Sequence, residues 1–533
     1  MIPKVTENSP PSPDPARDHP HPRLPLVLIL CCLFSFTLTH YGGITSPDSE
    51  VVLRTAGALA DNHTFAVHNL GVWKGFGVAR GPNGEYYSIF GPMESVLLAP
   101  AVKTAEWFNQ TRWYESWPEY LPVSFYVGTG LHDFVLKNKP ADPASHALRF
   151  LVSFFNILVS CICVYAFYLI SKRFVGSDLV AFFVSIVYAL GTMTWNYAGT
   201  MFSEPLATMF ALLSFYYILG PPGHPGDLPS GKRLALSGLM LGFSVATHIT
   251  AMLFVPFFAV YPFLQAKRIE PAFWKSIRNS IPFVIGLGLV LLLLGVYNYA
   301  RFGNMFETGR SVDPEAMKSF GYGSFTSPWE GLVGLTVSWG KGLLWYSPAV
   351  LLGLLGLREI FRKYRTLSWT LLCMVIFRLL FLACRSDWHG GYCLGPRYLL
   401  MIIPFTLIPF GFWLKQQFAL RNWNMIYFAS GVTAVFISLQ LYFNIGEVIS
   451  FYFVHVWNSG GRLHSYIELF FDPEYSPFLH ILDGLRSPFL LMNLPVSNLT
   501  LWLLGLLAVG ACSFIGVMLL KTELNKTDST API

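Results

Sequence analysis

The sequence predicts an all-α polytopic membrane protein with about 12 transmembrane helices and a large first outward loop carrying short membrane-surface helices. Three observations lead to this fold class. Hydrophobic residues make up 53% of the 533 residues, charged residues only 12%, and the mean hydropathy is +0.48, values far from those of soluble proteins. Apolar runs long enough to cross a bilayer as a helix recur along the chain. Lys and Arg residues concentrate in alternate connecting segments, as in chains that cross a membrane repeatedly.

The first apolar run, residues 24–40, follows a segment rich in Pro, Asp and His, residues 1–23, which we expect to be a disordered cytoplasmic tail. No small-residue cleavage site follows the run, so we interpret it as an uncleaved transmembrane helix rather than a signal peptide. The remaining spans are expected at residues 150–171, 179–199, 205–219, 234–248, 250–265, 281–300, 342–357, 367–384, 398–414, 423–444 and 499–520.

Residues 24–444 therefore form one membrane module. An outward segment, 445–498, the last transmembrane helix and a cytoplasmic tail, 521–533, come after it. On this arrangement 19 of the 36 Lys and Arg residues lie in inside segments, although the outside segments are more than twice as long in total. We expect a multi-pass protein of the cell membrane with both termini in the cytoplasm and segments 41–148 and 301–341 on the outer face. Its expected partner is the lipid bilayer, and nothing in the composition points to nucleic acid.

The outward segment 41–148 is too long for a simple connection and predicts a small subdomain on the outer ends of the spans. Ser46 followed by Pro47 is typical of a helix N-cap and first helical position, and apolar residues then recur at helical spacing. A turn-rich aromatic stretch, residues 84–92, precedes a second apolar helix at residues 93–108. This second helix is too short to span, so we expect it to lie along the membrane surface.

Three carboxylates, Asp48, Glu50 and Glu204, lie just beyond the outer ends of apolar runs. Acidic residues in the first turn of a helix complement its dipole by about 0.3–1 kcal/mol, which is a structural explanation for all three. The alternative is catalysis, because a carboxylate at this boundary can accept a proton from a hydroxyl group held near the lipid headgroups. We favour catalysis for Asp48 and Glu50, which follow the first span on its outer side. For Glu204, between Ser203 and Pro205, both explanations stay open.

A second polar group occupies the loop after the span at 367–384, where Arg385 and Arg397 bracket Asp387, His389 and several glycines. The planar fork of arginine suits a phosphate, and glycine lets the backbone approach a ligand closely, so we expect phosphate binding here. The structural alternative is that the aromatic residues of the loop anchor in the membrane interface while the arginines extend to water.

Arg301, Arg310 and Lys341 form a further outward basic set. The glycine spacing before Lys341 differs from that of a Walker A loop, so ATP is not implied. The eight cysteines are scattered and lack the spacing of a zinc site or a disulfide framework. Cys384 and Cys393 flank the arginine loop and could pair in an oxidising compartment, although we favour two free thiols.

Several longer motifs accompany the acidic pair Asp48 and Glu50. They are Tyr86-Tyr-Ser-Ile-Phe-Gly-Pro-Met-Glu94, Phe202-Ser-Glu-Pro205, Tyr297-Asn-Tyr-Ala-Arg-Phe-Gly-Asn304, Gly340-Lys-Gly-Leu-Leu-Trp-Tyr-Ser-Pro348 and Trp388-His-Gly-Gly-Tyr-Cys-Leu-Gly-Pro-Arg-Tyr-Leu399. Through these motifs, residues 24–415 resemble a group of uncharacterised prokaryotic membrane proteins. That group is similar to the C-type glycosyltransferases, the superfamily of dolichyl-phosphate-mannose protein mannosyltransferases and lipid A aminoarabinose transferases.

The resemblance implies an inverting transfer of a hexose or pentose from a polyprenyl-phosphate donor. The acceptor would be a lipid, glycan or protein on the outer face of the cytoplasmic membrane. Asp48 matches the first-loop catalytic acid of the family. Mannosyltransferases often carry adjacent Asp and Glu there, whereas this chain has Asp-Ser-Glu.

The chemistry of the residues leads to the same expectation. Nucleotide sugars are absent outside the cytoplasmic membrane, and a polyprenyl phosphate supplies its own leaving group. The protein then needs a base for the acceptor, for which we favour Asp48, and cations for the departing phosphate. Arg385 and Arg397, with help from Arg301 or Lys341, are the expected phosphate ligands. A divalent metal is compatible with this chemistry, but no cofactor is indicated.

A lipid or sugar transporter is the alternative from another class of protein. It predicts paired ionisable residues inside the spans that face a central path. The sequence places only Arg378 well inside a span. We therefore favour an enzyme.

The charge asymmetry makes the topology testable. Reporter fusions after Ser171 and after Lys521 should report the cytoplasm, and a fusion within residues 110–140 should report the outside, because positive segments stay inside. A cytoplasmic signal from residues 110–140 would invert the arrangement and remove the argument for a lipid-linked donor.

Overall fold

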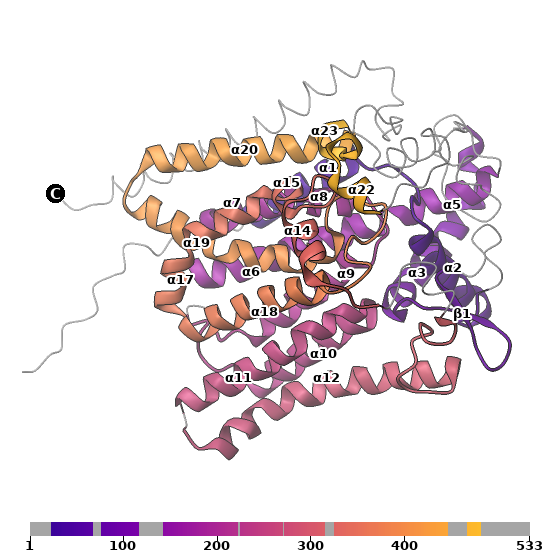
Figure 1. The fold of residues 1–533 in the computed structure, drawn as a ribbon, viewed down its shortest axis with the longest axis horizontal. Coiled ribbons are helices and arrows are strands. Elements are labelled where there is room, and N and C mark those ends of the chain that lie inside the picture. The colour runs from indigo at the N-terminus through magenta and orange to yellow at the C-terminus, as the bar shows by residue number, and fades with distance from the viewer. Residues whose placement is uncertain are drawn as a thin grey trace, which may run out of the picture.

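The computed structural model describes residues 23–67, 76–116, 142–221, 224–269, 271–314, 324–445 and 466–480. The expected last span at 499–520, the tail 521–533 and most of segment 445–498 lie outside these residues. Long helices run side by side as a bundle, and α2 (Pro47–Asn62) and α3 (Pro92–Asn109) lie together at one end of it (Figure 1).

The bundle helices follow the predicted apolar runs in order. They are α1 (Leu24–Leu38), α6 (Phe155–Val175), α7 (Asp178–Leu190), α9 (Glu204–Ile218), α10 (Gly231–Thr247), α11 (Val255–Ile269), α12 (Phe273–Phe302), α18 (Arg365–Ala383), α19 (Ile403–Ala419) and α20 (Trp423–Ile445). Within the described ranges, six helical stretches are long and apolar enough to cross a membrane, and α1 and α7 are shorter apolar helices. The chain is therefore a membrane protein, while the number of about 12 spans stays a prediction.

Short elements connect these helices. They are η1 (Trp113–Ser116), α5 (Pro143–Ser153), α8 (Thr194–Ala198), η2 (Ile249–Phe254), α14 (Pro328–Val337), α15 (Leu343–Tyr346), η3 (Pro348–Leu351), α16 (Leu352–Leu355), α17 (Leu357–Lys363), η4 (Arg397–Ile402), α22 (Tyr466–Phe471), η5 (Pro473–Tyr475) and α23 (Pro477–His480).

Both helices predicted in the first outward loop are present. Helix α2 begins at Pro47, and the Ser46 hydroxyl caps it by accepting a hydrogen bond from the Ser49 amide at 3.2 Å. Helix α3 begins at Pro92. A feature that the sequence analysis did not predict lies between them: strands β1 (Val78–Arg80) and β2 (Tyr86–Ser88) pair antiparallel. Their turn includes Gly84 at φ +85°, which glycine adopts without strain.

The expected span at 342–357 is wrong as a single helix, because this stretch is divided among α15, η3, α16 and α17. Pro348 has no amide hydrogen to continue α15, and Gly356 separates α16 from α17. The break expected between the spans at 234–248 and 250–265 is present. Helix α10 ends at Thr247, and His248 is extended, with φ −141° and ψ 114°.

Helices α10 and α12 approach each other unusually closely because two glycines face the opposite backbone. A Cβ added at Gly238 would lie 2.0 Å from the carbonyl oxygen of Phe283. A Cβ added at Gly286 would lie 2.0 Å from the carbonyl oxygen of Ala235. Small residues allow such backbone contact between membrane helices. This contact fixes the spacing of two helices, α10 and the C-terminal part of α12, whose ends border the candidate site.

We expect Gly286→Ala to lower the unfolding free energy by about 1–3 kcal/mol, because the added methyl group has to displace backbone atoms. Gly288 is the matched control, since it is in the same helix and a Cβ there meets no atom within 4 Å. Melting temperatures of both variants in detergent provide the measurement. Equal melting temperatures would contradict the close contact.

Candidate functional site

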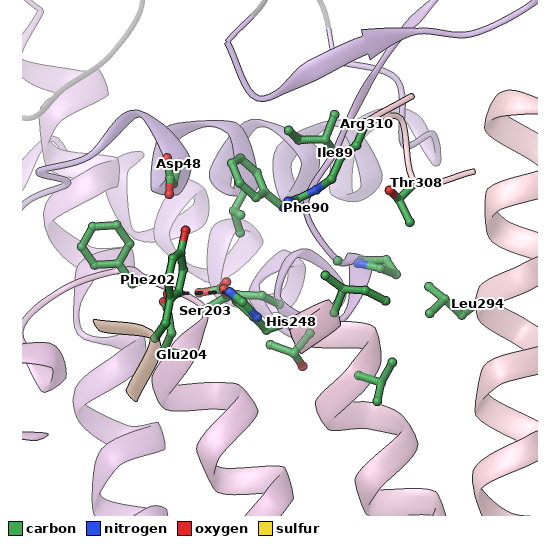
Figure 2. A pocket seen from close by; sticks show the side chains of 18 of the residues that line it. Asp48, Ile89, Phe90, Phe202, Ser203, Glu204, His248, Leu294, Thr308 and Arg310 are labelled. Atoms are coloured by element: carbon green, nitrogen blue, oxygen red, sulfur yellow. Dashed lines mark ion pairs between the residues drawn. The ribbon is translucent and has the colours of Figure 1, made fainter. Parts of the chain in front are cut away.

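A cavity lies where the segment predicted to form the first outward loop meets one end of the helix bundle. Its described lining residues come from the starts of α2, α3, α9 and η4, the break after α10 and the C-terminal end of α12. The side chains of Asp48 and Glu204 lie on one side, and those of Thr308 and Arg310 lie on the other (Figure 2). The structure thus brings distant polar motifs of the sequence into one space.

Asp48 enters the cavity because the start of α2 is anchored to the segment before α9. The Ser49 hydroxyl donates a hydrogen bond to the carbonyl oxygen of Met201 at 2.8 Å. Asp48 therefore lies close to the residues that open α9. Its carboxylate pairs with Arg397, whose Nη1 is 3.0 Å from Asp48 Oδ2.

Arg397 also reaches a second carboxylate. Its Nε lies 3.4 Å from Glu204 Oε1, an ion-pair distance without the geometry of a hydrogen bond. Only 9% of the Arg397 side chain and 2% of the Glu204 side chain is exposed. The guanidinium lies over the Phe202 ring at 4.6 Å. A buried cation held by two carboxylates and a ring is fixed in place, so its orientation is set before any ligand arrives.

His248 lies on the other side of Glu204. Its Nε2 is 3.7 Å from Glu204 Oε1, and its Nδ1 is 2.8 Å from the Thr250 hydroxyl. Burial first, and then the nearby charge of Arg378, hold the pKa of His248 well below its usual range. The imidazole is therefore neutral at physiological pH, and its contact with Glu204 is dipolar rather than ionic.

The opposite side of the cavity is basic. Arg301, in the last turn of α12, donates hydrogen bonds to the Ser88 carbonyl oxygen and to Asn298 Oδ1, the latter at 2.8 Å. Its guanidinium lies 3.8 Å from the centre of the Tyr297 ring. Arg310, which is half-buried, also lines the cavity. The sequence placed Arg310 in one basic set with Arg301 and Lys341, but Arg310 was not one of the expected phosphate ligands.

Glu94 also lines the cavity, although the sequence did not single it out as a site residue. It is fully buried, and among the described residues neither carboxyl oxygen has a hydrogen-bond partner. Burial first, and then the charges of Glu204 and Asp48, raise the pKa of Glu94 well above its usual range. One sequence signal could have identified Glu94 as a candidate. It lies in the first turn of α3, as Asp48 lies in the first turn of α2.

Glu50, predicted to act beside Asp48, is not among the lining residues. Its buried carboxylate accepts hydrogen bonds from Arg54 Nε at 2.8 Å and from Arg149 Nη2 at 2.6 Å and Nε at 3.1 Å. Side chains two residues apart on a helix point in different directions, so Glu50 lies in other surroundings than Asp48. Glu50 instead joins α2 to α5.

The loop predicted to bind phosphate also contributes only part of its predicted site residues to the cavity. Arg385 is not a lining residue, and its two nitrogens pair with the two oxygens of Asp387 at 2.6 Å each. Lys341 is fully buried outside the cavity, where it donates to the carbonyl oxygens of Gly391 at 2.7 Å and Cys393 at 2.6 Å.

His389 is also outside the cavity lining, and its Nδ1 accepts a hydrogen bond from the Gly391 amide at 2.9 Å. Burial lowers its pKa to about 3, so the ring is neutral. Cys384 and Cys393 are free thiols. Of this loop's predicted site residues, only Arg397 reaches the cavity, because the loop bends back on itself at Gly390 and Gly391, both with positive φ.

Arg378, the charged residue inside a predicted span, bonds to the protein backbone. Its guanidinium donates to the carbonyl oxygen of Tyr398 at 3.0 and 2.8 Å and to that of Thr250 at 2.8 Å. It thereby joins α18 to the starts of η2 and η4. This bonding explains its presence within a span without a transport path.

In the portion of the chain that the structure describes, no group of three or more His, Cys, Asp or Glu side chains is arranged to hold a metal ion. The carboxyl groups of Asp48, Glu94 and Glu204 thus share a cavity without forming such a cluster.

No protein-family model matches the chain, and no curated protein matches it. Among solved structures, the chain is similar to ArnT from Cupriavidus metallidurans bound to undecaprenyl phosphate, with 12% identity over 92% of this chain and 77% of that one and a TM-score of 0.44. It is also similar to ArnT in the apo state, at a TM-score of 0.45 and 11% identity over 92% and 76% of the two chains.

A third similar structure is the oligosaccharyltransferase from Archaeoglobus fulgidus, at a TM-score of 0.43 and 9% identity over 77% of this chain and 52% of that one. Both proteins are C-type glycosyltransferases, the superfamily that the sequence resemblance named. At these low identities and TM-scores, the likeness transfers no site residue, substrate or activity to this chain.

Proposed function

We propose that this protein is a membrane glycosyltransferase that moves a sugar from a polyprenyl-phosphate donor to a lipid, glycan or protein acceptor at the outer face of the membrane. One observation supports it most. A cavity at the outer end of an apolar helix bundle holds a carboxylate, Asp48, on one side and an arginine, Arg310, on the other. A donor with a lipid tail and a phosphate needs this boundary between apolar and aqueous surroundings.

The charges of the cavity suit a phosphodiester. The described lining includes the arginines Arg301, Arg310 and Arg397. Set against the three arginines, the carboxyl groups of Asp48 and Glu204 leave the described lining with at least one net positive charge, because burial raises the pKa of Glu94 well above its usual range and also raises that of Glu204. A sugar linked to a polyprenyl phosphate carries one negative charge on its phosphodiester. The cavity can therefore neutralise the donor without a metal ion.

The two sides of the cavity suggest a division of labour. In an inverting transfer, the acceptor oxygen forms its bond to the anomeric carbon on the face opposite the departing phosphate oxygen. Asp48 would accept the acceptor's proton on one side as that bond forms. Arg301 and Arg310 would stabilise the phosphate on the other side as the bond from carbon to phosphate oxygen breaks and the electron pair leaves with polyprenyl phosphate.

This arrangement changes the role expected for Arg397. Two carboxylates already contact its guanidinium, and they would repel a phosphate. We assign Arg397 to orienting Asp48, and we assign the phosphate to Arg301 and Arg310. Leu294 of α12 lines the cavity beside them, and α12 exposes apolar side chains such as Leu292 and Val296. That surface offers a path for the lipid tail.

Asp48→Asn should lower the transfer rate by about 10²- to 10⁴-fold, the usual contribution of a general base. The measurement is consumption of a polyprenyl-phosphate hexose by the protein in nanodiscs with membrane extract as acceptor. Glu50→Gln is the contrasting variant. It weakens the contacts of the buried Arg149 and should lower the melting temperature, with little effect on the rate per folded molecule. Full activity of Asp48→Asn would mean that Asp48 only complements the dipole of α2, and it would overturn the assignment of Asp48 as the general base.

Arg310→Ala should weaken binding of bare polyprenyl phosphate in nanodiscs about 10- to 100-fold, because hydrogen bonds to a charged group are lost. Arg310→Lys should restore only part of the affinity, since a point charge lacks the planar two-pronged contact. Arg385→Ala is the matched control, because it removes the same charge from outside the cavity lining. If Arg385→Ala weakened binding and Arg310→Ala did not, the phosphate would bind at the Arg385 loop, as the sequence predicted.

A further inference from the structure

Glu94 carries an inference that rests on the proposed function and extends it to the substrate sugar. We propose that Glu94 is a specificity-determining residue that binds a hydroxyl group of the donor sugar through a neutral carboxyl group. The side chain lines the cavity, is completely buried, and has no hydrogen-bond partner among the described residues.

The place of Glu94 is fixed from two directions. Helix α3 begins against the end of α10, where a Cβ on Gly91 would lie 2.2 Å from the carbonyl oxygen of Ala246. One residue after Glu94, the Ser95 hydroxyl donates to the carbonyl oxygen of Val52 at 3.0 Å, one turn after Asp48 in α2. The Glu94 carboxyl group is thereby held between the helix that supplies the base and the hinge beside Glu204.

Structural roles for Glu94 do not match its contacts. A glutamate at the third position of a helix often accepts a hydrogen bond from the N-cap amide, but neither Glu94 oxygen does so. Glu50 shows how this chain satisfies a structural buried carboxylate, with three hydrogen bonds from two arginines. A buried polar group without a partner is rare in folded proteins and indicates a ligand.

The chemistry of a neutral carboxyl group matches a sugar hydroxyl. Its O–H donates and its carbonyl oxygen accepts, and a hydroxyl group both accepts and donates. Burial, and then the nearby Glu204 and Asp48, raise the pKa of Glu94 and favour its uncharged form. Glutamine has the same shape and also donates and accepts, so Glu94→Gln should preserve the contact while Glu94→Ala removes it.

The test compares two probes in nanodiscs: bare polyprenyl phosphate and polyprenyl-phosphate hexoses carrying glucose or mannose. We expect the wild type to bind one hexose lipid more tightly than the bare lipid. Glu94→Ala should reduce this preference about tenfold and leave affinity for the bare lipid unchanged. Glu94→Gln should keep most of the preference. Deoxy analogues of the preferred sugar then identify the hydroxyl group that Glu94 binds. Removing that hydroxyl group and replacing Glu94 by Ala should have non-additive effects on the affinity, because both changes remove the same contact.

Infrared spectroscopy provides a readout that does not depend on the ligand. The wild type should show a protonated carboxyl band at neutral pH that is absent from Glu94→Gln, and melting temperatures check that the variants are folded. The proposal fails if Glu94→Ala keeps the sugar preference, if Glu94→Gln loses as much as Glu94→Ala, or if the wild type has no preference. If the wild type binds neither lipid, the proposed function itself is wrong.

Discussion

The buried guanidinium of Arg397 is the contact on which the site depends. It comes from the start of η4 and meets Asp48 of the first outward loop and Glu204 at the start of α9. Charges removed from water are stable only when paired. Burying Arg397 therefore requires both carboxylates to be present, and this requirement holds the outward loop against the bundle.

Other cations join irregular backbone at the same end of the protein. Arg378 donates to the carbonyl oxygens of Tyr398 and Thr250, and Lys341 donates to those of Gly391 and Cys393. Loops and the ends of short 3-10 helices leave some carbonyl groups without partners, which is costly away from water. Using buried cations as donors lets the chain build loops at this depth. These loops are the ones that place Arg397 and His248 at the cavity.

The acidic residues of the outward helices show why residue type alone does not identify a role. Asp48, Glu50 and Glu94 all lie in the first turn of α2 or α3. Glu50 is saturated by arginines, Asp48 pairs with one arginine at the cavity, and Glu94 faces the cavity without a partner among the described residues. The differences in partner, rather than in sequence position, separate structural from functional candidates.

The sequence by itself determined the class of protein, the bounds of most helices and the pair of helices in the outward loop, because composition, apolar periodicity and the Ser-Pro start of α2 are local signals. It also indicated the polar motifs from which the cavity is built. Only the tertiary structure decided which residues of each motif meet. Asp48 and Glu50 are separated by the angular spacing of a helix, and Arg385 and Arg397 by the turn at Gly390 and Gly391. Glu94 gained its place from the packing of Gly91 against α10, a contact between segments far apart in the chain that no local pattern encodes.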